Sequence, residues 1–249
     1  MSYDFKQRIF TSALLFLGFV FVGLLDNLFL TWLVVGALMI LSIKEIKNIL
    51  KLTQNDIYVY AIATWVVALF YEKPEDLVFV VAIILLSMVS YNKSVKLKNL
   101  LPLAYPLAPY LFIFSLYVSY GMKALVWLVV VVISVDAGAY LFGKKFGKTK
   151  FCATSPNKTI EGAIAGVVVA TILGSLFVIT NISFLAGLLI SFVVAVSAIF
   201  GDLFESYLKR EANIKDSGNI FPGHGGVLDR ADGYLFAGII LVVMIRFFI

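Results

Sequence analysis

GDLFESYLKREANIKDSGNIFPGHGGVLDRAD, residues 201–232, is a dense polar stretch that lies between two long apolar segments. The chain of 249 residues is 61% hydrophobic and only 14% charged. A soluble domain carries about 25% charged residues, and the mean hydropathy of this chain is +1.00. The composition therefore predicts an all-α integral membrane protein, in which this stretch is the main polar feature.

Apolar segments recur along the whole chain and predict its architecture. Nine candidates are residues 9–25, 28–43, 57–71, 77–91, 103–118, 124–142, 160–179, 184–201 and 233–249. Several are shorter than the roughly 20 residues that cross a hydrocarbon core, so their ends must include flanking polar residues. We therefore expect a polytopic protein with about nine transmembrane helices.

Lys and Arg are distributed unevenly between alternate loops. With nine spans and a cytoplasmic N-terminus, only Lys73, Lys123 and Arg246 of the 20 Lys and Arg residues lie on the outer side. Cytoplasmic loops carry the excess of Lys and Arg, so this is the expected orientation. It predicts a multi-pass protein of the cell membrane, with the Gly201–Asp232 stretch facing the cytoplasm.

Polar groups within the apolar segments are concentrated in the second half of the chain. Residues 1–120 are expected to be transmembrane scaffold helices, and residues 121–249 a transmembrane catalytic region with cytoplasmic motif loops. Asp136 lies well inside an apolar segment, where an Asp costs about 2.5–3.5 kcal/mol on insertion scales. Such a residue usually faces a polar interior and serves function. The single cysteine, Cys152, excludes an intramolecular disulfide.

The first part of the polar stretch has the spacing of a helix with one polar face. Positions i, i+3, i+4 and i+7 are occupied by Asp202, Glu205, Ser206 and Lys209. The helix is expected to end near Asn213, before a turn at Asp216-Ser217-Gly218. A charged cytoplasmic loop without a ligand is the alternative, and the helical spacing weighs against it.

The second part combines a Gly-rich loop with carboxylates. Pro222-Gly223-His224-Gly225-Gly226 is a flexible, Gly-rich loop, which lets backbone N–H groups approach an anion closely. Asp229 and Asp232 follow at i, i+3. Mg²⁺ is usually held by one or two carboxylates together with substrate oxygens and water. We therefore expect a metal site with Asp202, Asp229 and Asp232 as ligands and phosphate groups nearby.

A second motif, SPNKTIEG, opens the apolar segment that starts at residue 160. Ser155 or Thr159 can cap the helix, and the free N–H groups of a helix N-terminus bind anions. Lys158 adds a positive charge for a phosphate group. In isolation this motif is a weak signal, because helix capping alone is the alternative explanation of it.

Three segments resemble the phosphatidate cytidylyltransferases, also called CDP-diacylglycerol synthases. They are D-x-x-A-Y-x-x-G-x-x-x-G-K from Asp136 to Lys148, S-P-x-K-T-x-E-G from Ser155 to Gly162, and the run from G-D-L-x-E-S at Gly201 to P-G-H-G-G-x-L-D-R-x-D at Asp232. Motif detail covers roughly residues 134–233, and only the pattern of spans is similar before that. Ala231 stands where the family tends to carry a larger apolar residue or Thr. Asn157 stands where the family often carries a basic residue.

The resemblance implies the reaction CTP + phosphatidate → CDP-diacylglycerol + pyrophosphate in phospholipid biosynthesis. The nucleophile is a phosphate monoester with a second pKa of about 6, so no strong general base is required. Positive charge must instead bring two polyanions together. Mg²⁺ is the implied cofactor, and a second metal ion is left open. The implied partners are CTP, phosphatidate and membrane lipids, with no nucleic acid. The oligomeric state is left open, with a homodimer as one option.

The same resemblance distributes roles among the polar residues. The catalytic set is Asp202, Lys209, Asp229, Arg230, Asp232 and His224, with His224 as a hydrogen-bond donor to phosphate rather than a base. The substrate-binding set is Ser155, Lys158, Thr159, Glu205, Ser206, Arg210, Lys215, Asp216, Gly225, Gly226 and Asp136.

Three alternatives stand beside this interpretation. A CTP-dependent lipid kinase is the nearest, and its products would distinguish it. A secondary transporter would place Asp136, Asp202 and Glu205 along an ion path, but the chain has no internal repeat. A CDP-alcohol phosphatidyltransferase shares D-x-x-D-G, here Asp229–Gly233, yet continues with further acids in G-x-x-x-D-x-x-x-D. No acid follows Asp232, so this third alternative is excluded.

Overall fold

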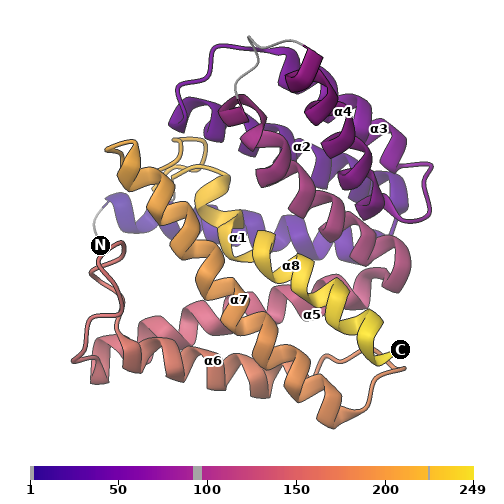
Figure 1. Cartoon of the computed structure of the whole chain (residues 1–249). Coiled ribbons are helices and arrows are strands. Elements are labelled where there is room, and N and C mark those ends of the chain that lie inside the picture. Colours follow the sequence, from indigo (N-terminus) through magenta and orange to yellow (C-terminus); the bar gives the residue numbers. More distant parts are fainter. Residues whose placement is uncertain (1–2, 92–96, 224) are drawn as a thin grey trace. The chain divides into compact units, whose positions relative to one another are not determined.

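The structure is a computed structural model that describes residues 3–91, 97–223 and 225–249, with side chains described from Phe10 onward except at 97 and 98. The described residues form eight α-helices and no β-strand. The predicted all-α class is therefore confirmed. Figure 1 shows the helices coloured along the sequence.

The helices follow the predicted apolar segments. They are α1 (Tyr3–Leu25), α2 (Leu28–Ile49), α3 (Asp56–Ala68), α4 (Leu77–Tyr91), α5 (Ala108–Phe146), α6 (Ile160–Ser175), α7 (Phe184–Glu211) and α8 (Leu228–Phe248). Short helical turns are η1 (Pro74–Asp76), η2 (Leu97–Leu100) and η3 (Leu103–Leu107). Two predicted segments, 103–118 and 124–142, are joined in η3 and α5. The backbone of Gly121 (φ 74°, ψ −175°) leaves the helical conformation between them.

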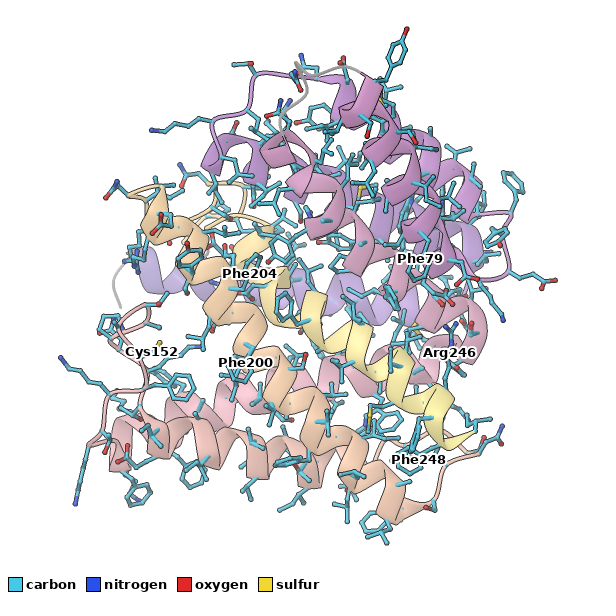
Figure 2. All side chains as sticks on the ribbon, viewed as in Figure 1. Phe79, Cys152, Phe200, Phe204, Arg246 and Phe248 are labelled. Atoms are coloured by element: carbon cyan, nitrogen blue, oxygen red, sulfur yellow. The ribbon has the colours of Figure 1, made fainter. Side chains whose placement is uncertain are left out.

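Five helical segments of the described chain are long and apolar enough to cross a membrane. They are Leu28–Ile49, Pro74–Tyr91, Leu103–Phe146, Phe184–Glu211 and Leu228–Phe248. Phe10–Leu25, Asp56–Ala68 and Ile160–Ser175 are apolar but shorter. Large apolar side chains such as Phe79 and Phe200 are exposed, at 68% and 55% (Figure 2). These features are those of a polytopic membrane protein, and the count of nine spans stays a prediction.

Contacts within the chain define two compact units. Unit 1 consists of Met1–Ser119 and Asp216–Arg230, and unit 2 consists of Tyr120–Lys215 and Ala231–Ile249. The segment Asp216–Arg230, which contains the Gly-rich loop, thus belongs with the N-terminal helices.

Polar cross-links join the helices of unit 1. The indole Nε1 of Trp32 in α2 donates to the carbonyl of Trp65 in α3 at 2.8 Å, and Trp65 Nε1 donates back to the Trp32 carbonyl at 3.2 Å. The hydroxyls of Ser42 and Tyr110 lie 2.9 Å apart in the core. Each contact satisfies a polar group that would be costly to bury alone, so these pairs fix α2 against its neighbours.

Small residues let the helices of unit 2 approach closely. A Cβ atom added at Gly138 of α5 would lie 2.9 Å from the Cα of Gly166 in α6, and one at Gly143 would lie 3.4 Å from the Cα of Gly162. Close helix contact at glycines is typical of membrane proteins. The glycine of D-x-x-A-Y-x-x-G therefore serves packing. Helix α6 in turn runs beside α7 (Figure 1).

Candidate active site

Four polar residues of α7 in unit 2 lie on one face, as their spacing predicts. The side chains of Lys209 and Glu205 form an ion pair one turn apart. Glu205 is fully buried, and Lys209 is 8% exposed. Ser206 donates its hydroxyl to Asp202 at 3.3 Å. The helix ends with Asn213 in the left-handed region, at φ 57°, close to the predicted position.

The SPNKTIEG motif places a lysine beside this face. Thr159 has extended backbone angles, and its Oγ1 accepts the N–H of Gly162 at 3.2 Å. Thr159 is therefore the N-cap of α6, whereas Ser155 is a half-buried loop residue whose carbonyl accepts the Lys158 N–H at 3.1 Å. The ammonium of Lys158 forms an ion pair with Asp202. Within this motif, Thr159 therefore caps the helix and Lys158 carries the positive charge.

Glu161 has a structural role that the sequence analysis did not assign. Its carboxylate accepts the backbone N–H groups of Lys148 and Thr149 at 3.1 Å each and the Thr149 hydroxyl at 2.9 Å. It therefore ties the basic loop after α5 to the first turn of α6. An acid in the first turn of a helix is favoured by the helix dipole, which is the signal that could have identified it.

Carboxylates gather where α7 and α8 meet. A Cβ atom at Gly201 would collide with the carbonyl of Asp232, so the two helices touch there. The side chain of Asp232 is half-buried and within electrostatic range of three other acids, namely Asp202, Glu205 and Asp136. Asp136 itself is exposed on α5. Like charges held together favour a cation in their vicinity.

The acidic group of unit 2 offers the carboxylate oxygens that a hard cation prefers as ligands. Among the described residues, no group of three or more His, Cys, Asp or Glu side chains has the arrangement of a complete metal site. Mg²⁺, however, commonly takes only one or two protein carboxylates and completes its octahedron with water and substrate oxygens. Asp202 and Asp232 on adjacent helices fit that requirement, and Lys158 already places one positive charge against Asp202.

The Gly-rich loop of unit 1 is organised around a carboxylate of the protein itself. Oδ2 of Asp229, in the first turn of α8, accepts the N–H of Gly226 at 2.7 Å. It also accepts the N–H of Ser217 at 2.8 Å and its hydroxyl at 2.9 Å. Gly225 has φ 82°, and a Cβ there would meet the Asp229 carboxylate. The anion that these amides approach is Asp229, because an aspartate placed beside the loop accepts them as a phosphate would.

Glu45 of α2 is the principal residue that the sequence analysis missed. The residue is only 3% exposed. It accepts the N–H groups of Val227 and Leu228 at 2.9 and 2.8 Å and the hydroxyl of Ser217 at 2.8 Å. In the sequence Glu45 stands between Lys44 and Lys47 at the end of an apolar segment, a pattern that indicates a solvated helix end. No local signal therefore distinguishes it.

The remaining predicted site residues are mostly exposed. The guanidinium of Arg210 donates to the carbonyl of Ile214 at 3.0 Å and closes the end of α7. Exposed side chains also include those of Lys215, Asp216 and Arg230. His224 lies outside the described residues, so its role stays a prediction.

Comparison with known proteins supplies an independent line of evidence. The sequence profile of the Cytidylyltransferase family matches residues 6–248. A Helicobacter pylori (strain J99) protein named phosphatidate cytidylyltransferase is 41% identical over 245 residues, covering 97% of this chain and 92% of that protein. A Bacillus subtilis (strain 168) protein of the same name is 33% identical over 275 residues, covering 98% of this chain and 99% of that protein.

A shorter match concerns one part of the chain only. Phosphatidate cytidylyltransferase 4, chloroplastic, of Arabidopsis thaliana is 43% identical over 118 residues, which cover 46% of this chain and 30% of that protein. The family profile and the two bacterial proteins, by contrast, extend over nearly the full length. The chain therefore belongs to the cytidylyltransferase family.

Proposed function

We propose that this protein is a phosphatidate cytidylyltransferase, which makes CDP-diacylglycerol and pyrophosphate from CTP and phosphatidate. The observation that carries this conclusion is the match, over nearly the whole of both chains, to bacterial proteins of that name. The polar motifs between apolar helices are what a lipid-modifying nucleotidyltransferase requires, because one substrate is in the membrane and the other in water.

The reaction is a displacement at phosphorus. An oxygen of the phosphatidate phosphate attacks the α-phosphorus of CTP and forms a new P–O bond. The bond from the α-phosphorus to the oxygen that bridges it to the β-phosphorus breaks, and pyrophosphate leaves with that electron pair. Because the phosphate monoester is largely dianionic near neutral pH, catalysis consists mainly of positioning and charge neutralisation.

Lys158 is the best-placed residue for neutralising charge. It precedes the N-terminus of α6, where the backbone N–H groups add partial positive charge, and its ammonium is held by Asp202. An incoming triphosphate competes with Asp202 for this ammonium. Exchange of partners would then release Asp202 when the nucleotide binds, which couples substrate binding to the acidic group on α7 and α8.

Mg²⁺ is the cofactor that the acidic group of unit 2 fits, with Asp202 and Asp232 as protein ligands, and Asp229 of unit 1 stays a ligand predicted from the sequence. When bound, it would offset the negative charge of the attacking and leaving oxygens. The chain's own contribution is to hold the carboxylates. Asp202 is fixed by Ser206 and Lys158, and Asp229 by the N–H groups of Ser217 and Gly226.

We further propose that the chain crosses the membrane nine times and has a cytoplasmic N-terminus. The 44-residue segment Leu103–Phe146 is about twice the length needed for one crossing. The non-helical backbone of Gly121, near its middle, supports a division into two spans. An odd number of spans from a cytoplasmic N-terminus puts the loops with most Lys and Arg on the cytoplasmic side, where CTP is available.

The assay uses purified protein in detergent with Mg²⁺, phosphatidate and CTP labelled in either the α- or the γ-phosphate. Label from the α-position should enter the lipid phase, with one pyrophosphate released per lipid formed. Label from the γ-position should stay in the aqueous phase. Transfer of the γ-label, with release of CDP, would identify a CTP-dependent lipid kinase instead. Absence of turnover with either label would contradict both enzyme assignments.

A further inference from the structure

We infer that Glu45 is a positioning residue, which sets the place and hydrogen bonding of Asp229 through Ser217 and the start of α8. The inference rests on the proposed function, in which Asp229 belongs to the catalytic machinery. It assigns a part in the reaction to α2, a helix that the sequence analysis treats as scaffold.

Glu45 holds both ends of the loop that precedes α8, with Ser217 at one end and Val227 and Leu228 at the other. It accepts the backbone N–H groups of Val227 and Leu228, which begin α8, and the hydroxyl of Ser217, on the other side of the loop. Helix N-terminal N–H groups lack partners within the helix, and a carboxylate is a strong acceptor for them. Asp229 is the next residue along α8, so its direction follows from how Glu45 holds Leu228.

Ser217 connects the two carboxylates directly. Its hydroxyl oxygen lies 2.8 Å from Oε2 of Glu45 and 2.9 Å from Oδ2 of Asp229. A hydroxyl has one proton and donates to one of the two acids at a time. When the hydroxyl donates its hydrogen bond to Glu45, the Ser217 oxygen can accept the Asp229 N–H, at 3.3 Å. Glu45 therefore decides how many hydrogen bonds the Asp229 carboxylate accepts.

Gly218 and Gly226 are needed to bring the backbone of this loop, which precedes α8, against Glu45. A Cβ atom at Gly218 would lie 2.6 Å from Oε1 of Glu45, and one at Gly226 would collide with the same carboxylate and with the Ser217 hydroxyl. Real Cβ atoms do not approach so closely, so any larger residue would displace the loop. These glycines are thus explained by a buried acid of α2, in addition to any contact with nucleotide.

The experiment compares Glu45→Gln, Ser217→Ala and their double variant with wild type. Glu45→Gln keeps the size of the side chain but replaces one acceptor oxygen by an NH₂ donor, which cannot receive the N–H or O–H groups around it. Residues that hydrogen-bond to a metal-ligating side chain and orient it typically contribute 10–100-fold to activity or metal affinity. We expect kcat to fall by about 10–100-fold, with the KM values for CTP and phosphatidate changed by less than about threefold.

Matched controls separate positioning from general stability. Glu75→Gln alters an equally buried acid of unit 1, 2% exposed in η1, and should retain wild-type kcat. Hydrogen exchange supplies a readout that does not depend on turnover. The amides of Val227 and Leu228 should exchange faster in Glu45→Gln and remain protected in Glu75→Gln.

The double variant tests whether Glu45 acts through Ser217. If both belong to one chain of contacts, the double variant should be about as active as the poorer single variant, because coupled residues are not additive. Wild-type kcat in Glu45→Gln, or losses that multiply in the double variant, would overturn the inference. If Glu45→Gln does not fold, normal kcat in Ser217→Ala would overturn it equally.

Failure of the proposed function has a different signature. A wild-type protein that forms no cytidine-bearing lipid would remove the proposed function, whereas the exchange rates of the Val227 and Leu228 amides would still decide whether Glu45 anchors the start of α8.

Discussion

Replacement of Lys209 by Met should reveal whether this lysine neutralises Glu205 or is available to substrate phosphate. In the structure the side chain of Glu205 is 0% exposed and that of Lys209 is 10% exposed, and the two form an ion pair. Breaking a buried pair by removing one partner costs about 3–5 kcal/mol, because the other charge is left buried without compensation. A chain of this size loses roughly 2–4 °C of melting temperature per kcal/mol, so the fall should be about 6–20 °C.

The measurement is the midpoint of thermal unfolding in detergent, followed by intrinsic fluorescence, with turnover recorded in parallel. The double variant Glu205→Gln, Lys209→Met removes both charges and should recover more than half of the lost melting temperature. Lys123→Met, an exposed lysine of α5, should change it by no more than about 2 °C. A melting temperature of Lys209→Met equal to wild type, together with lost turnover, would refute the ion-pair reasoning and favour a phosphate contact.

Two further predictions concern the metal and the topology. Asp229→Asn keeps size but removes a charge that a divalent cation needs, so turnover of the labelled-CTP assay should fall by several orders of magnitude and recover in part at higher Mg²⁺; undiminished turnover would exclude Asp229 as a ligand. In a Cys152→Ser background, an impermeant thiol reagent applied to intact cells should label a cysteine at Lys73 but not one at Lys215, both exposed positions; the reverse pattern would invert the topology.

Local patterns were sufficient for the helices. Long apolar runs predict membrane helices because the backbone must satisfy its own hydrogen bonds in lipid, and each predicted run coincides largely with a helix. Helix starts were also readable where a side chain caps them. Thr159 caps α6, and Asn27 caps α2 by accepting the Leu30 N–H at 3.0 Å. The end of α7 near Asn213 follows from the turn residues after it.

Local patterns indicated the break in α5 but were not sufficient for the ion pairs. Gly121, where the helical backbone is interrupted, lies between the predicted segments 103–118 and 124–142. The i, i+4 spacing of Glu205 and Lys209 permits an ion pair, yet such a pair on a solvated face contributes little. Only packing shows that this one is buried, which changes its energetic role.

The sequence by itself therefore determined the membrane class and the family and indicated the candidate site residues, because these depend on composition, spacing and motif identity. The tertiary structure alone decided how the Gly-rich loop is held. Glu45 and Ser217 are 172 positions apart, and their contact depends on how α2 packs against the segment before α8. Hydrogen bonds between distant residues leave no periodic trace in a sequence, since either partner would look the same at a solvated helix end or in an open turn.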